Sequence, residues 1–328
     1  MVGVLPYFQL WFQENDVMTH SVVIPLYNKA DYVAETLESL VSQTKLPDEL
    51  IIVDDASSDN SLTIAKCFLE NNAARFESCK ISVIELKENK GPGNARNTGL
   101  RHATEELISF LDADDLYHPN LLAVASDLFE QQKIEFLVLN IEFLPGREVY
   151  PKLDGLKKYL QAAGGGLYKI LTPLKAVSSP HFIMGVGSNV IVKRKWIGNT
   201  EYATQSLLNE GIDFWYRVLK SIPGNGNIGL LTGEYLKVRE VPGSLSRKTY
   251  LHFKEIEIPP VIPRYISSKD INDRLLMAMI GKRWYMYALQ TLPSNRQKIL
   301  FVLHYTYLMP AYLHCVFLKL ITNFKKAK

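Results

Sequence analysis

The sequence predicts an α/β fold in which a mostly parallel sheet is flanked by helices, followed by a helical C-terminal extension rich in aromatic and basic residues. Short apolar runs with many β-branched residues alternate with longer segments of helical periodicity from His20 to about residue 140. The connections between these segments are short. Strands and helices that alternate in this way build parallel sheets covered by helices on both faces.

The strands predicted in the first half are continuous apolar runs, which indicates burial on both faces. The first run, SVVIPL, spans residues 21–26, and the second ends at Asp54 and Asp55. The five expected strands are residues 21–26, 50–53, 81–86, 107–111 and 135–139.

The helices predicted between these strands are defined by their apolar faces and by the residues that start them. Val33, Leu37 and Leu40 fall on one helical face, and Pro47 closes that unit. Ser58 is a good N-cap for the next helix. The four expected helices are residues 31–44, 58–69, 91–102 and 119–131.

The alternation stops after about residue 145, where glycines and prolines mark loops such as residues 164–166. We expect a strand at residues 188–192, a helix at about 211–220, and helical structure from Ile271 onward. The predicted organisation is a leader or N-terminal extension at residues 1–17, an α/β domain at residues 18–255 and a helical extension at residues 256–328.

Composition excludes several classes of function. The 328 residues are 47% hydrophobic and 22% charged, which is typical of a globular protein. A net charge of +3 does not indicate the basic coat of a nucleic-acid-binding protein. Cys67, Cys79 and Cys315 are odd in number and form no C-x-x-C pair, so we expect neither a disulfide framework nor a cysteine zinc site. A reducing, cytoplasmic compartment is the simplest interpretation.

Five aspartates follow two of the predicted strands: Asp54, Asp55, Asp112, Asp114 and Asp115. Ligands of open α/β sheets bind beyond the carboxyl ends of the strands. A single aspartate there is often a helix cap, but a cluster repels itself unless a cation or hydrogen-bond donors compensate it. The Asp112-Ala-Asp114 spacing suits Mg²⁺ or Mn²⁺ bound together with a phosphorylated ligand.

A glycine-rich segment at residues 88–99 matches a dinucleotide-binding fingerprint only in part. Arg96 occupies the third glycine position, and the segment follows the third predicted strand rather than the first, which argues against NAD. A glycine turn that opens a helix and carries Arg96 toward an anion is the better interpretation, and an ordinary surface loop is the alternative.

Four ordered segments resemble the motifs of family 2 glycosyltransferases with the GT-A fold. They are SVVIPLYN at residues 21–28, IVDDASSD at 52–59, NKGPGNARNTG at 89–99 and FLDADD at 110–115. The resemblance is specific over about residues 20–120 and weaker to about residue 250. It implies an inverting transferase that moves a sugar from a nucleotide-diphosphate sugar to an acceptor hydroxyl.

The resemblance also implies which residues bind the donor. Pro25 and Tyr27 would border the nucleotide, Asp54 or Asp55 would contact its base, and Arg96 would help to hold the nucleotide portion.

The same resemblance implies a metal site and a catalytic base. Asp112 would face the ribose or the metal, and Asp114 would be the principal metal ligand. The family usually presents a Glu-Asp pair before an aromatic-rich helix, but Gly211 stands here in place of that aspartate. Glu210 and Asp213 remain as candidate bases and can share a helix face. We favour Glu210 because it precedes the helix, although both residues could be capping or salt-bridge acids.

The C-terminal extension combines basic and aromatic residues. Residues 274–328 contain nine Lys and Arg and no Asp or Glu. The apolar stretch at residues 300–324 is too interrupted for a confident transmembrane span. Its composition suits association with an anionic membrane surface at the inner face of the cell membrane, and ordinary helical packing is the alternative.

These observations predict a metal-dependent sugar transferase whose acceptor is a glycan or a lipid-linked glycan in surface polysaccharide synthesis. Two other classes stay open at this point. A nucleotidyltransferase also uses acids and a metal, but usually has a glycine-rich basic loop after its first strand. A catalytically inactive module that binds nucleotide sugars or glycans is possible because of Gly211.

Overall fold

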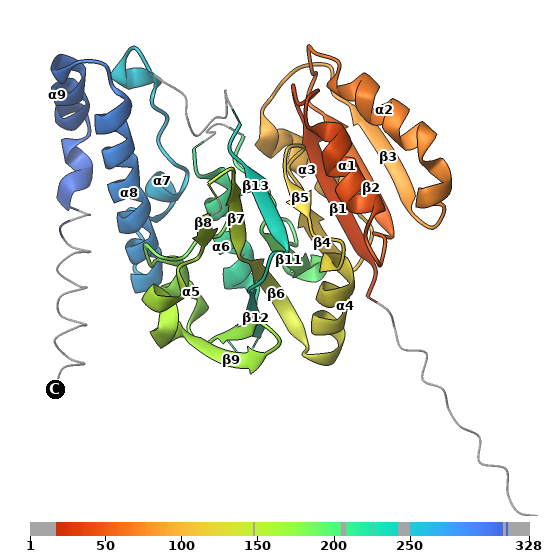
Figure 1. The fold of residues 1–328 in the computed structure, drawn as a ribbon. Helices are drawn as coiled ribbons and strands as arrows, with labels where there is room; N and C mark the ends of the chain where they lie inside the picture. Colours follow the sequence, from red (N-terminus) through yellow and green to blue (C-terminus); the bar gives the residue numbers. More distant parts are fainter. Residues whose placement is uncertain are drawn as a thin grey trace, which may run out of the picture.

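A computed structural model describes residues 18–146, 148–204, 208–224, 226–241, 250–310 and 313. The expected leader at residues 1–17 lies outside the described residues, as does Cys315. Figure 1 shows a central sheet with the C-terminal helices α8 and α9 packed at one side of the molecule.

The large central sheet has nine strands in the order β3-β2-β1-β4-β11-β6-β12-β10-β9. The first four strands of this order are parallel to one another, whereas β11 runs antiparallel to both of its neighbours. β12 pairs with β6 in parallel, and β10 and β9 complete the edge as antiparallel strands. The strands are β1 (His20–Leu26), β2 (Glu49–Asp54), β3 (Lys80–Glu85), β4 (Leu107–Phe110), β6 (Ile134–Leu139), β9 (Leu160–Gly164), β10 (Leu167–Ile170), β11 (Val190–Lys193) and β12 (Asn227–Leu231).

A smaller sheet has four strands in the order β5-β13-β7-β8. Its central pair, β13 and β7, is parallel, and both edge strands are antiparallel to their neighbours. The strands are β5 (Leu116–Tyr117), β7 (Ile141–Leu144), β8 (Glu148–Tyr150) and β13 (Leu236–Arg239).

The helices that connect the parallel strands lie where the apolar periodicity predicts them. Helix α1 buries Val33, Leu37 and Leu40 against the sheet, as expected from their spacing. The helices are α1 (Val33–Val41), α2 (Ser61–Asn71), α3 (Pro92–His102), α4 (Leu121–Gln131), α5 (Pro173–Val177), α6 (Glu210–Ser221), α7 (Val261–Tyr265), α8 (Ile271–Thr291) and α9 (Asn295–His304).

The glycine-rich segment at residues 164–166 lies in a turn, in agreement with the loop expected there, but the strands on either side of it were not predicted. Residues 164–166, expected as a loop, form the turn of a hairpin between β9 and β10. Gly164, Gly165 and Gly166 all have positive φ, at 92°, 58° and 80°. Only glycine adopts three such angles without steric cost. The three glycines therefore allow the tight turn between the two strands.

The order of the strands creates a crevice. The chain goes from β1 outward to β2 and β3, and β4 then returns to the other side of β1. Ligands of open α/β sheets bind at such a reversal, beyond the carboxyl ends of the strands. The first of the glycosyltransferase-like motifs ends two residues after β1, and the fourth begins at the last residue of β4.

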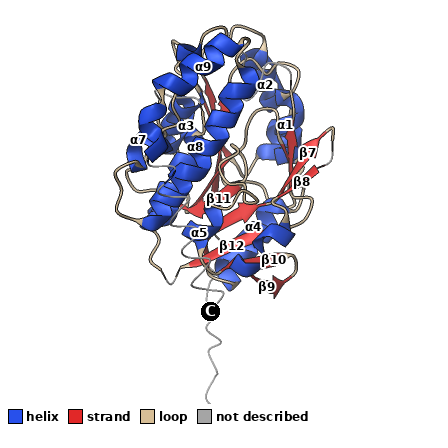
Figure 2. Cartoon of the chain, turned by 90° about the vertical axis from the view of Figure 1, so that its left-hand side faces the viewer, coloured by secondary structure: helices blue, strands red, loops and turns tan. Residues whose placement is uncertain are grey.

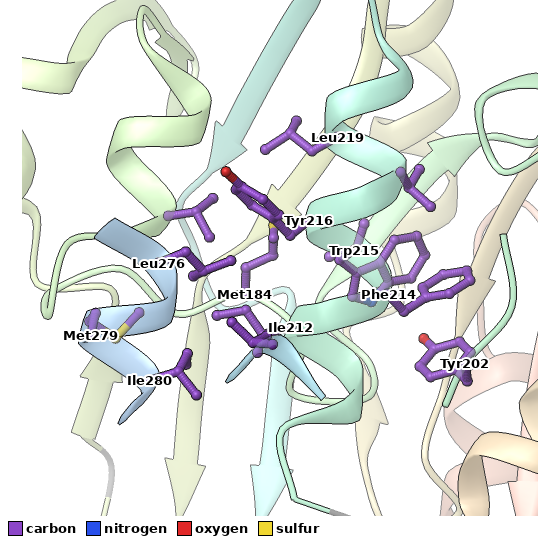
Figure 3. Close-up of a cluster of buried hydrophobic side chains, with 14 of the residues drawn as sticks. Met184, Tyr202, Ile212, Phe214, Trp215, Tyr216, Leu219, Leu276, Met279 and Ile280 are labelled. Atoms are coloured by element: carbon purple, nitrogen blue, oxygen red, sulfur yellow. The ribbon is translucent and has the colours of Figure 1, made fainter. Parts of the chain in front are cut away.

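The C-terminal helices share a core with the α/β domain. One buried cluster includes Phe214 and Trp215 of α6 together with Leu276, Ile280 and Trp284 of α8. Figure 2 shows α8 as a long helix running across the molecule, and Figure 3 shows its side chains beside those of α6. No helix among the described residues is long and apolar enough to cross a membrane.

Candidate active site

A cavity of about 790 Å³ lies at the predicted crevice. Seven of the nine residues predicted for the site line it, whereas Asp54 and Asp213 do not. The seven are Pro25, Tyr27, Asp55, Arg96, Asp112, Asp114 and Glu210.

Of the two aspartates that end β2, Asp55 faces the cavity. Its carboxylate accepts hydrogen bonds from the backbone N–H of Lys90 at 3.1 Å and of Gly91 at 2.8 Å. Burial raises the pKa of Asp55 although these two amides act against it. Asp54 accepts a hydrogen bond from the backbone N–H of Ser57 at 3.1 Å, which ties it to the loop that follows the strand.

Arg96 joins two carboxylates that are far apart in the sequence. Its Nη2 donates to Asp112 Oδ1 at 2.7 Å, and its Nη1 donates to Glu210 Oε1 at 3.1 Å. The guanidinium also lies over the ring of Tyr202, at 5.4 Å from the centroid. Burial alone would lower the pKa of Arg96, but the charge of Asp112 and the groups of Tyr202 and Glu210 raise it above its usual value. Arg96 therefore stays charged and fixes both acids.

Glu210 is the first residue of α6 and points into the cavity. Burial raises its pKa above the usual value, and the charge of Arg96 opposes this shift. A carboxylate with a raised pKa is a stronger base than an ordinary glutamate.

Close packing explains why a glycine, Gly211, follows Glu210. A Cβ on Gly211 would lie 2.2 Å from the carbonyl oxygen of Gly185, whose own φ is 87°. The two backbones approach so closely that no aspartate fits at position 211. The departure from the family's Glu-Asp pair thus follows from how α6 packs.

Asp213 has a different environment from Glu210. It is fully buried and forms ion pairs with Arg217 at 3.0 Å and with Arg264 at 2.8 Å. These contacts join α6 to α7, and Asp213 does not line the cavity.

Asp112 and Asp114 both line the cavity and could hold a divalent cation. Asp112 Oδ1 contacts Arg96, and Asp114 Oδ2 accepts a hydrogen bond from Lys29 Nζ at 2.5 Å. Burial and the neighbouring Asp112 raise the pKa of Asp114, and Lys29 opposes this. No group of three or more His, Cys, Asp or Glu suited to a metal occurs among the described residues. Two carboxylates nevertheless match Mg²⁺, which usually takes its remaining ligands from water and substrate phosphates.

The aspartates are held in place by residues that the sequence did not single out for this role. Ser188 Oγ accepts the backbone N–H of Asp112 at 2.9 Å and donates to Asp115 Oδ2 at 2.6 Å. A Cβ on Gly187 would lie 1.8 Å from Asp112 Oδ2, so only glycine leaves room for that carboxylate. The signal was present in part, because small residues at 185–189 indicate a close backbone approach.

Other residues of the lining were also missed. Lys29 directly follows the first motif, so its position could have been noticed. Arg283, Trp284 and Tyr287 come from α8, and no pattern in the sequence connects them to the cavity.

A second cavity, of about 870 Å³, lies at the opposite edge of the sheet. It is lined by residues such as Met18, Glu106 and Lys193, which are close to the amino ends of the parallel strands. None of the predicted site residues lines it. The chemistry therefore points to the cavity that contains Asp112 and Glu210.

Residues 21–167 match the sequence model described as "Glycosyl transferase family 2". The resemblance in the motifs is thus confirmed over this part of the chain, which is similar to family 2 glycosyltransferase domains. The minor teichoic acid biosynthesis protein GgaA of Bacillus subtilis is 31% identical over 201 residues, which are 60% of this chain and 40% of GgaA. WfgD of Escherichia coli, named as a UDP-Glc:alpha-D-GlcNAc-diphosphoundecaprenol beta-1,3-glucosyltransferase, is 28% identical over 46% of this chain and 58% of WfgD. The chain spans less than two thirds of the length of these curated relatives.

Solved structures support the fold. A crystal structure of residues 1–349 of Staphylococcus aureus TarS in complex with UDP-GlcNAc has a TM-score of 0.67 and 18% identity, and the match covers 90% of this chain and 82% of that one. A further structure of the same TarS fragment has a TM-score of 0.59 and 19% identity, over 83% and 73% of the two chains. The predicted GT-A fold is confirmed.

Proposed function

We propose that this protein is an inverting glycosyltransferase that moves a sugar from a nucleotide-diphosphate sugar to an acceptor hydroxyl. One observation carries the proposal: Glu210 shares a cavity with Asp112, Asp114 and the residues expected to border the nucleotide. A candidate base, two metal-binding acids and a donor pocket are the parts that this reaction requires.

In the proposed reaction, Glu210 accepts the proton of the acceptor hydroxyl. The acceptor oxygen forms a bond to the anomeric carbon while the bond from that carbon to the diphosphate breaks on the opposite face. Arg96 keeps the Glu210 carboxylate oriented through the hydrogen bond at 3.1 Å. The same guanidinium also holds Asp112. The position of the Glu210 carboxylate is therefore fixed relative to Asp112 on the donor side of the cavity.

A divalent cation, Mn²⁺ or Mg²⁺, would be held by Asp112 and Asp114, and it would neutralise charge on the departing diphosphate. The chain's own contribution is the pair of carboxylates and their supports. Lys29 balances the charge of Asp114 through the contact at 2.5 Å. The pKa of Asp114 is raised, which means that its ionised form is unfavourable in this environment. A cation beside the carboxylate would stabilise that ionised form.

The proposed acceptor is a surface polysaccharide or a lipid-linked glycan. The names of GgaA and WfgD, which concern teichoic acid and a diphosphoundecaprenol-linked sugar, support this class. An acceptor of this kind would be met at the inner face of the cell membrane. The basic C-terminal extension, with nine Lys and Arg in residues 274–328, supports a peripheral position on that anionic surface.

Binding of the donor can be tested by a thermal-shift screen of nucleotide sugars with and without Mn²⁺. We expect one donor to raise the melting temperature, more strongly with Mn²⁺, and Asp114→Asn to remove most of the metal-dependent part. Asp154→Asn is the matched control because Asp154 is a surface residue that pairs with Lys157 and does not line the cavity. Stabilisation that depends neither on Mn²⁺ nor on Asp114 would contradict the assigned site.

Metal-dependent hydrolysis of the stabilising donor without acceptor separates an enzyme from an inactive module. Tight donor binding with no hydrolysis and no transfer to any glycan acceptor would favour the module.

A further inference from the structure

The cavity has a wall that lies outside the family 2 domain. Arg283, Trp284 and Tyr287 of α8 line it, together with the residues of the glycosyltransferase motifs. The matched family segment ends at residue 167, more than a hundred residues before α8. These side chains therefore lie outside the matched family segment.

The packing of α6 and α8 determines which end of the cavity they reach. The C-terminal end of α6 is joined to the start of α8, because Lys220 pairs with Asp273 at 2.7 Å and the hydroxyl of Tyr216 donates to Asp273 at 3.0 Å. Away from this contact, toward the start of α6 and the middle of α8, Ile212 and Ile280 belong to one buried cluster (Figure 3). The two helices therefore run in opposite directions.

Arg283 and Glu210 both line the cavity, and each lies the same number of residues along its helix from the Lys220–Asp273 pair. Ten residues separate Lys220 from Glu210 on α6, and ten separate Asp273 from Arg283 on α8. At a rise of 1.5 Å per residue, both stretches are about 15 Å long. The α8 residues thus meet the cavity on the side of the candidate base, which is where an acceptor hydroxyl has to be placed.

The charge of Arg283 is not matched by an acid. Lys29 and Arg96, the other cations of the lining, are paired with Asp114 and with Asp112 and Glu210. Within the described part of the chain, Arg283 makes one hydrogen bond, from Nη2 to the carbonyl oxygen of Pro180 at 2.9 Å, and no ion pair. Desolvation by the surrounding chain lowers its pKa. A guanidinium that faces a cavity with N–H groups to spare and no carboxylate is suited to bind an anion.

The neighbouring aromatic residues give this position a firm support. Trp284 is buried, and its Nε1 donates to the carbonyl oxygen of Glu257 at 2.9 Å. Its ring packs against Phe301 and Tyr305 of the C-terminal helices. Tyr287 presents a further ring to the cavity, and aromatic rings are favourable surfaces for sugars.

We propose that Arg283 and Tyr287 form an acceptor subsite that selects acceptors with a phosphate group close to the reacting sugar. Arg283 binds the phosphate, Tyr287 supports the sugar ring, and Glu210 faces the hydroxyl that reacts. The subsite rests on the proposed transferase function, because Glu210 defines which side of the cavity is the acceptor side.

The test measures binding to the full chain saturated with UDP. The probes are glucose 1-phosphate and its neutral counterpart, methyl α-glucoside, titrated by calorimetry. We expect glucose 1-phosphate to bind more tightly than the glucoside, and Arg283→Gln to weaken it about 10-fold or more while the glucoside and UDP change less than twofold. Arg283→Lys, which keeps the charge but loses the planar fork, should show an intermediate effect.

Lys282→Gln is the matched control, because Lys282 is the adjacent exposed cation of α8 and does not line the cavity. It should leave all three affinities unchanged. Melting temperatures of the variants show whether α8 stays packed, and a cooperative unfolding transition close to that of the parent is required before affinities are compared.

Three results would overturn the subsite. Equal affinity for glucose 1-phosphate and the glucoside would remove the phosphate selectivity. A loss of UDP affinity in Arg283→Gln as large as the loss for glucose 1-phosphate would place Arg283 in the donor site. An equal loss of affinity for glucose 1-phosphate in Lys282→Gln would show that the effect comes from the overall positive charge of α8 and not from Arg283. Failure of the transferase proposal is distinguishable from these, since it would appear as absent UDP and donor binding in the parent protein.

Discussion

Arg96 forms ion pairs with two carboxylates, those of Glu210 and Asp112. The acids come from α6 and from the end of β4, and Arg96 of α3 is almost completely buried between them. A buried guanidinium with two carboxylate partners loses little charge at any physiological pH. Arg96 therefore links the position of the candidate base, Glu210, to that of Asp112 on the donor side of the site.

Replacing Glu210 by Gln should lower kcat by about 10²- to 10⁴-fold, the usual contribution of a general base, with donor affinity nearly unchanged. The raised pKa of Glu210 gives a second signature. The base acts only when ionised, so kcat/KM should rise with pH through a pKa above the usual 4.5, and this acid limb should vanish in Glu210→Gln. Rates with the parent and variant across the pH range provide the measurement.

Asp213→Asn is the informative control for this experiment. It leaves Arg217 and Arg264 without their shared carboxylate and should cost about 2 kcal/mol of folding free energy, measured by urea denaturation. Turnover per folded molecule should stay within a few fold. The reverse pattern, with Asp213→Asn inactive and Glu210→Gln active, would contradict the assignment of the base.

At the scale of elements, the start of α6 is placed by a contact between two glycines. Gly185 and Gly211 come from separate segments, and their backbones are too close for a side chain on either one. Because Glu210 directly precedes Gly211, this contact also decides how far the candidate base reaches into the cavity.

Gly211→Ala should push α6 away from Gly185, since a Cβ would lie 2.2 Å from a backbone oxygen that cannot rotate aside. We expect a loss of about 1–3 kcal/mol in stability, as for other overpacked sites, and at least a tenfold loss in kcat through displacement of Glu210. The measurements are urea denaturation and initial rates at saturating donor.

Gly146→Ala serves as the control, because no atom of the described residues lies within 4 Å of the added Cβ there. Its stability and rates should match the parent. If Gly211→Ala behaved in the same way, the glycine contact would not position α6.

At the scale of the whole molecule, the charges are divided between the two halves of the chain. Residues 1–120 hold nine basic and nineteen acidic residues, and residues 121–328 hold twenty-eight and fifteen. The small net charge of +3 is thus a cancellation. The acidic half carries most of the proposed donor and metal site, and the basic half includes α8 with its anion-binding Arg283.

Membrane association should depend on exposed apolar residues of α9 rather than on α8, whose inner face belongs to the core. Ile299 and Leu303 are 59% and 61% exposed and lie one turn apart. Replacing both by Ser should lower binding to anionic phospholipid vesicles about 10-fold or more, because each large apolar side chain contributes about 1.5–3 kcal/mol when fully buried. Vesicle sedimentation at low and high salt measures this.

Val149→Ser is the control, since Val149 is a 42% exposed apolar residue of β8, outside the C-terminal helices. It should not change sedimentation. If the parent protein stayed in the supernatant with anionic vesicles at low salt, the proposed membrane surface would be wrong. Deleting residues 274–328 would be a poor test, because it removes Leu276, Ile280 and Trp284 from the core.

The fold class could be predicted from the sequence alone, and so could the gathering of most of the candidate donor-binding residues at one cavity. The strands are continuous apolar runs and the motifs directly follow them, so local pattern and parallel topology together place Pro25, Asp55 and Asp112 at one edge of the sheet. The tertiary structure decided which acid of each pair faces the cavity. Asp55 and Asp213 have the same residue type, yet packing places Asp55 in the cavity lining and buries Asp213 between two arginines.

The packing of the C-terminal extension was likewise visible only in three dimensions. Its basic and aromatic composition is compatible with a membrane surface, with packing or with a ligand site, because composition carries no information on what a helix faces. The antiparallel arrangement of α6 and α8, held by the Lys220–Asp273 pair, is a contact between residues 53 positions apart that no local pattern encodes. That contact brings Arg283 to the cavity beside Glu210.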